Sequence, residues 1–246
     1  RWPTVLQEAV VAMLPKGGTA APDDRRPIVL LPLLYRFWAA VRAQQLQAWL
    51  RQHGVLGTGP EASAEILAAD LAFEMQRART LGVPLDGLAV DWSKCYDHLP
   101  LDVLHSALQA TGLGPRLIGP VMSIYKAPRR IAADGMAGRR RVPTHGLPPG
   151  CPLATMVLAI ITYGWRVELA NAVQGVRSRT YVDDMIAYRR RHMGDTVVGP
   201  LEAMQRVTDA FEGAFYLRRN LKKSVRFSGE PQVREALQGT AGDNVA

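Results

Sequence analysis

Cysteine is scarce in this sequence of 246 residues, and a long apolar run is missing. The two cysteines, Cys95 and Cys151, are too few for a disulfide framework or a zinc cluster. They favour a reducing, intracellular setting, without distinguishing nucleus from cytoplasm. The most apolar stretch, residues 152–165, is shorter than the roughly 20 residues that a bilayer span needs. These features argue against a disulfide-rich secreted protein and predict a protein without a membrane partner.

Histidines are also few, and their spacing does not suit metal binding. The five of them are scattered along the chain, at His53, His98, His105, His145 and His192. No internal repeat, low-complexity linker or secretory signal is visible. Because the chain begins at Arg1 rather than methionine, we expect it to be part of a longer protein. The sequence does not indicate an oligomeric state.

Basic residues are in excess. Thirty Lys and Arg against 22 Asp and Glu give a net charge of +8. Such a surplus indicates a polyanionic partner, since neutralised phosphates release counterions, but it is equally typical of an ordinary basic protein. With 48% hydrophobic residues, the chain can bury a core as one large domain or two close subdomains.

The apolar pattern predicts interleaved strands and helices, and therefore the α+β class. Extended segments are expected at 10–14, 28–31 and 88–90, with a hairpin over 129–142 that turns at Asp134-Gly135 and two strands over 179–188. Helices are expected over 33–52, 62–80, 101–110, 152–172 and 200–216. An irregular tail is expected from Gly229 onward.

Two adjacent carboxylates occur in Tyr181-Val182-Asp183-Asp184. A hairpin that only reverses the chain usually turns on Asn-Gly or Asp-Gly. Neighbouring carboxylates repel unless a cation neutralises them, and Mg²⁺ prefers oxygen ligands of this kind. Taken alone, however, the pair is more typical of an exposed acidic turn.

Asp91 changes this interpretation because it follows the apolar run 88–90. A carboxylate at a strand end and another at a hairpin tip can converge on two metal ions, which stabilise the attacking and leaving oxygens of a phosphoryl transfer. By itself, Asp91 is as compatible with a helix cap or a turn. Between the acidic sites lies the loop 146–154, whose glycines permit close approach of the backbone to a ligand.

In order and spacing, these segments resemble the reverse transcriptase domain, most closely that of non-LTR retrotransposons. Residues 91–97 resemble motif A, 146–154 motif B, and 181–184 the YxDD box of motif C. Arg26-Pro27-Ile28 resembles a fingers element, and residues 217–224 resemble motif D. Five motifs in this order are far more specific than the YxDD box alone.

The resemblance implies a right-hand polymerase fold. Its antiparallel palm sheet would be backed by helices, with an interleaved fingers region and a thumb that is largely absent. The fingers would comprise residues 1–86 together with about 113–147. The palm would comprise residues 87–112 and 148–230. Residues 231–246 would form a tail or the start of a thumb.

The implied activity is template-directed addition of deoxynucleotides to a primer 3′-hydroxyl, with an RNA template, a DNA primer and dNTP as partners. Asp91 and Asp183 would hold two Mg²⁺ ions, with Mn²⁺ as an alternative. Asp184 would support the site electrostatically, because neighbouring strand residues point to opposite faces. Trp92 would contribute backbone groups near the ions. Lys223 would protonate the pyrophosphate, or else be one of several solvated charges.

Tyr96 occupies the steric-gate position, where its ring would exclude a ribose 2′-hydroxyl; the alternative is a core tyrosine. Arg26, with Lys16 beside it, would pair with the incoming triphosphate. Pro149 and Gly150 lie in the nucleotide-binding motif B, but Pro149 replaces the usual glutamine and offers no side-chain donor and no N–H. Either the backbone compensates or activity is weakened.

Two rival functions remain open. An RNA-dependent RNA polymerase is disfavoured by Tyr96, and a catalytically inactive nucleic-acid-binding relic is suggested by Pro149. The arginine runs 139–141 and 189–191 are compatible with contacts to template or primer phosphates and with solvated faces.

Overall fold

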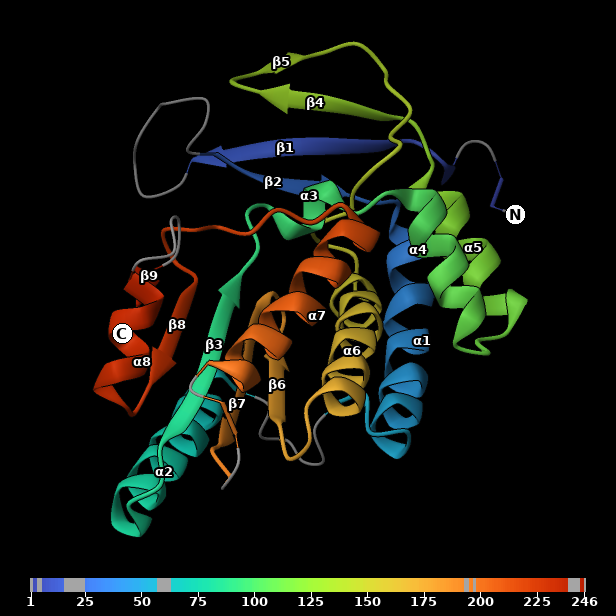
Figure 1. The fold of residues 1–246 in the computed structure, drawn as a ribbon. Coiled ribbons are helices and arrows are strands. Elements are labelled where there is room, and N and C mark those ends of the chain that lie inside the picture. The colour runs from blue at the N-terminus through green and yellow to red at the C-terminus, as the bar shows by residue number, and fades with distance from the viewer. Residues whose placement is uncertain are drawn as a thin grey trace. The chain divides into compact units, whose positions relative to one another are not determined.

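The computed structural model describes residues 2–3, 6–15, 25–56, 63–192, 195–196, 198–238 and 244–245. The chain divides into two compact units, each built from two stretches of sequence. Unit 1 comprises residues 1–49 and 95–157, and unit 2 comprises residues 50–94 and 158–246. Each unit contains its own β-sheet (Figure 1). The assignment of fingers and palm stays a prediction.

Unit 1 is built on a four-stranded sheet in the order β2-β1-β4-β5. Its strands are β1 (Ala9–Pro15), β2 (Arg25–Leu30), β4 (Arg129–Ala133) and β5 (Met136–Ala137). β1 pairs antiparallel with β2 and parallel with β4, while β4 and β5 form a hairpin. Asp134 and Gly135 turn this hairpin with φ angles of 51° and 78°, as a type I′ turn requires. The predicted hairpin and its turn are therefore confirmed.

The helices of unit 1 surround a core of buried aromatic and aliphatic residues. They are the first part of α1 (Leu33–Gln52), α3 (Cys95–His98), α4 (Leu101–Ala110), α5 (Pro115–Tyr125) and the first turn of α6 (Ala154–Ala172). Tyr35 on α1 and Tyr125 on α5 place their hydroxyls 3.2 and 3.5 Å from Sγ of Cys151. These buried contacts fix the chain immediately before α6.

Unit 2 is built on a five-stranded sheet in the order β6-β7-β3-β8-β9. Its strands are β3 (Leu85–Asp91), β6 (Arg177–Tyr181), β7 (Asp184–Arg190), β8 (Val225–Ser228) and β9 (Asn244–Val245). Neighbours are antiparallel except β8 and β9. At Gly87 in the central strand, a Cβ would lie 2.6 Å from the Ala187 carbonyl oxygen, so only glycine fits there.

Helices cover both faces of this sheet, with α2 (Ala64–Leu81) and α7 (Gly199–Phe215) on opposite sides (Figure 1). On α2, Glu74 bonds to Arg177 of β6 at 2.5 Å and Asp70 accepts the Tyr188 hydroxyl of β7 at 2.9 Å. On α7, Thr208 accepts the indole N–H of Trp165 from α6 at 3.0 Å.

Among the described residues, no helix combines the length and the apolar character that a membrane crossing needs.

The chain after Gly229 differs from the irregular tail that the sequence predicts. It forms α8 (Pro231–Gln238), and β9 then pairs with β8. Val233 and Leu237, one helical turn apart, are buried at 0% and 4% exposure. The expectation was wrong because two apolar residues in a short polar segment give only a weak helical pattern.

Candidate active site

The hairpin of β6 and β7 carries two of the predicted carboxylates. The strands pair as far as Tyr181↔Asp184, so Val182 and Asp183 form a two-residue turn and Asp184 begins β7. The φ angle of Val182 is 57°, a costly conformation for a β-branched side chain. Because strained residues of this kind cluster at functional sites, the backbone as well as the charge marks the turn as a candidate site.

Asp91 lies directly opposite Asp184, in the last pair between β3 and β7. Like charges in such a cross-strand pair destabilise a sheet. Burial of the carboxyl group, then the charges of Asp183 and Asp91, raise the pKa of Asp184, and the charge of Lys223 partly offsets this. Nζ of Lys223 is 3.5 Å from Oδ1 of Asp91. The structure therefore brings the four predicted catalytic residues together at one end of the unit 2 sheet.

The oxygen atoms gathered here suit a hard divalent cation. Within the part of the chain that the structure describes, no group of three or more His, Cys, Asp or Glu side chains is arranged to hold a metal ion by itself. Mg²⁺, however, usually takes one or two carboxylates and completes its coordination with water and substrate phosphates. Two opposed carboxylates with a third on the adjacent turn fit that pattern.

Trp92 is anchored in the core of unit 2. Its side chain is 2% exposed and stacks on Phe211 of α7 with ring centroids 5.6 Å apart. Its indole N–H donates to Oε1 of Glu212 at 3.0 Å, and the same oxygen accepts Nε–H of Arg219 at 3.0 Å. The side chain of Trp92 is therefore not available to a ligand, and its backbone role near the ions stays a prediction.

The predicted substrate residues of unit 1 lie on connected elements. The N–H of Val29 on β2 donates to the carbonyl of Pro149, and the N–H of Leu147 donates to the carbonyl of Tyr96, both at 2.7 Å. Gly150 has a φ of 100°, and a Cβ there would lie 3.1 Å from the Val29 carbonyl oxygen. Glycine is therefore required at this position.

Pro149 replaces the glutamine that is usual in motif B, yet the loop still bonds to β2. The bond from Val29 uses the backbone carbonyl of Pro149, which every residue has. Arg26 is exposed on the same strand, three residues before Val29. Tyr96 is the second residue of α3 and is partly exposed. Lys16 lies outside the described residues.

The arginine run 189–191 is not a solvated face, and its contact with template or primer phosphates stays a prediction. Arg189 pairs with Asp195, Arg190 lies 3.6 Å from Glu74, and Arg191 lies 2.9 Å from Asp86, as measured between side-chain atoms. All three arginines therefore form ion pairs within unit 2. The run 139–141 is exposed.

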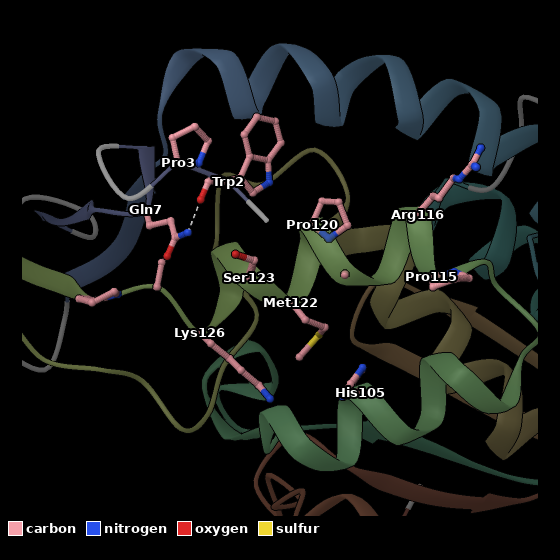
Figure 2. Close-up of a pocket in the computed structure, with 13 residues that line it drawn as sticks. Trp2, Pro3, Gln7, His105, Pro115, Arg116, Pro120, Met122, Ser123 and Lys126 are labelled. Carbon is pink, nitrogen blue, oxygen red and sulfur yellow. Dashed lines mark hydrogen bonds between the residues drawn. The ribbon is translucent and has the colours of Figure 1, made fainter.

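A hollow of about 280 Å³ adjoins the carboxylates of unit 2. Asp91, Asp184 and Lys223 line it together with apolar residues that include Leu67 and Leu71 of α2 and Ile186 of β7. The sequence gives these apolar residues no functional role, since their spacing is typical of any core. A second hollow, of about 1080 Å³, lies in unit 1 beside α5 (Figure 2), and none of the predicted site residues lines it.

A sequence model of the family described as reverse transcriptase (RNA-dependent DNA polymerase) matches residues 14–234. No curated protein matches the chain.

Solved structures share the fold of this chain. Telomerase from Candida tropicalis, in complex with a TWJ fragment of telomeric RNA, is 14% identical with a TM-score of 0.62, over 92% of this chain and 41% of that one. Telomerase from Candida albicans, also in complex with a TWJ fragment of telomeric RNA, is 14% identical with a TM-score of 0.61. The match covers 92% of this chain and 43% of that one. The RNA-dependent RNA polymerase of a human picobirnavirus is 16% identical with a TM-score of 0.55, over 89% and 40%.

At such identities the likeness shows the fold alone. The fold is the predicted α+β, right-hand polymerase fold, with antiparallel strands at the centre of its sheet. The chain spans less than half the length of each of these three relatives.

Proposed function

Because this chain belongs to the reverse transcriptase family, we propose that it copies an RNA template by adding deoxynucleotides to the 3′-hydroxyl of a DNA primer. The observation that supports this most is the cross-strand pair of Asp91 and Asp184, beside Asp183 and Lys223. The pair concentrates negative charge where a cation is needed. A surface used only to bind nucleic acid has no use for clustered carboxylates, because they repel phosphates.

Asp91 and Asp183 would hold two Mg²⁺ ions, or Mn²⁺ in their place, near the backbone of Trp92. Asp184 would support them electrostatically. Burial, then the charges of Asp183 and Asp91, raise its pKa, and bound cations would favour its ionised form. When bound, two such ions neutralise charge on the phosphate oxygens during transfer.

In the proposed reaction, the primer 3′-hydroxyl loses its proton to water as its oxygen bonds to the α-phosphorus, and the bond from that phosphorus to pyrophosphate breaks. Lys223, held 3.5 Å from Asp91, would give a proton to the leaving pyrophosphate. Arg26 and Lys16 would bind the triphosphate. Gly150 would let the backbone of its loop approach the nucleotide.

Primer extension by the purified protein tests this function. With an RNA template, a DNA primer and Mg²⁺ or Mn²⁺, we expect dNTPs to be incorporated at least about tenfold better than rNTPs. Equal or better use of rNTPs would favour an RNA-dependent RNA polymerase. No incorporation with either ion would favour an inactive nucleic-acid-binding relic.

Replacing Tyr96 by alanine should raise the use of rNTPs relative to dNTPs by about tenfold to a hundredfold. The reason is that the proposed gate excludes the 2′-hydroxyl with its ring, and alanine removes the ring. Tyr96→Phe is the matched control, since it keeps the ring and should keep the preference. Competition between the two nucleotides in one reaction gives the ratio, and a ratio that is unchanged in the alanine variant would show that Tyr96 is not the gate.

The motif order also supports an origin in a non-LTR retrotransposon. The residues that flank this chain in its parent protein test this, and an upstream endonuclease domain is the expected finding.

A further inference from the structure

Asp91 is held, on the side away from β7, by the segment 218–224. The N–H of Asp91 donates to Oγ of Ser224 at 3.1 Å, and its carbonyl accepts the N–H of Asn220 at 2.8 Å. The Ser224 hydroxyl lies 3.5 Å from the same carbonyl oxygen. Since Ser224 is only 4% exposed, water cannot readily replace it.

These contacts lie where the regular ladder between β3 and β8 has ended. The ladder between β3 and β8 ends at Ala89↔Val225, two residues before Asp91. Beyond that point, only the isolated bridge Trp92↔Arg219 continues the pairing on this side, and the bond from Asn220 to Asp91 belongs to it. Ser224 and Asn220 supply the acceptor and the donor, as buried backbone groups require.

The same contacts determine how Asp91 faces Asp184. The N–H and carbonyl of Asp91 bond to Ser224 and Asn220, so they form no hydrogen bonds with the backbone of Asp184. The two aspartates therefore form a non-hydrogen-bonded pair, the kind in which opposite side chains approach most closely. A small shift of the end of β3 would change the separation of the carboxylates directly.

We propose that Ser224 is a positioning residue, which holds the Asp91 carboxylate where it binds a divalent ion. The role of the divalent ion rests on the proposed function, whereas the contacts of Ser224 do not depend on it. Ser224 carries no charge and acts through Asp91. Partners one step removed from a metal ligand typically change ion affinity or activity by about tenfold to a hundredfold when they are lost.

Ser224→Ala tests this, because it leaves the Asp91 N–H without its acceptor. Binding of Mn²⁺, measured by electron paramagnetic resonance without nucleotide, should weaken about tenfold. The Mg²⁺ concentration for half-maximal extension should rise by a similar factor, while KM for dNTP stays unchanged. Ser224→Thr keeps the hydroxyl and should restore most of the ion affinity.

Ser228→Ala is the matched control. Ser228 is 5% exposed and donates to Asp86 at 2.6 Å, at the opposite end of β3. Its loss should lower thermal stability and leave Mn²⁺ affinity unchanged.

Three outcomes would overturn the positioning role: wild-type affinity in Ser224→Ala, equal weakening in Ser228→Ala, or no Mn²⁺ binding by the wild-type protein. Weakened binding in Ser224→Ala, together with no extension by the wild-type protein, would support the role and contradict the proposed function.

Discussion

Asp183→Asn is expected to slow primer extension by about a thousandfold and to leave RNA binding nearly unchanged. Asparagine has the size of aspartate and is well suited to a turn, so the hairpin should persist. The substitution removes the charge that the proposed ions need. RNA binding should be kept, since affinity for a phosphate backbone is expected to come mainly from basic residues, which the change does not touch. Single-turnover extension and RNA affinity should be measured on the same preparation.

Asp134→Asn is the matched control, because Asp134 also lies in a two-residue hairpin turn, with a φ of 51°. It should extend primers at the wild-type rate. Full activity in Asp183→Asn would remove Asp183 from the catalytic residues. Loss of RNA binding in that variant would indicate damage to the fold.

Asp86→Ala should lower the free energy of unfolding of the protein by about 3 to 5 kcal/mol. The side chain of Asp86 is 1% exposed, accepts the Ser228 hydroxyl at 2.6 Å and lies 2.9 Å from the Arg191 guanidinium. Alanine removes the charge that compensates Arg191, itself only 12% exposed. The effect should fall toward the lower end of this range, because Glu230 still pairs with Arg191.

Urea unfolding followed by circular dichroism measures the change. Glu8→Ala is the control, since Glu8 also pairs with an arginine, Arg130, at 3.0 Å, but is 44% exposed. An ion pair so open to solvent contributes less than about 1 kcal/mol. Similar losses in the two variants would mean that burial does not decide the strength of the Asp86 contacts.

The carboxylate site could be predicted because its residues carry local signals. Asp91 follows an apolar run, and Asp183-Asp184 interrupts another. Which aspartate lies opposite Asp91 could not be predicted, because it depends on the register of β3 against β7. A slip of one residue would exchange the two faces of a strand.

Other features are invisible in the sequence for physical reasons. No element is predicted over α5, because Gly119 and Pro120 are poor helix formers, yet burial of Ile118 and Val121 in the core outweighs that preference. The contact of Ser224 with Asp91 joins residues 133 positions apart. No local pattern encodes such a pairing, and a serine after Lys223 gives no signal of it.

The central strand β3 is fixed at both ends by polar contacts, with Asp86 at one end and Asp91 at the other. Gly87 has no room for a side chain. Residues 88–90 between them need only be apolar and of similar volume, since such exchanges cost little. In copies of this sequence that diverge over time, we therefore expect aliphatic residues to interchange at 88–90 while the spacing of the acidic site is inherited unaltered.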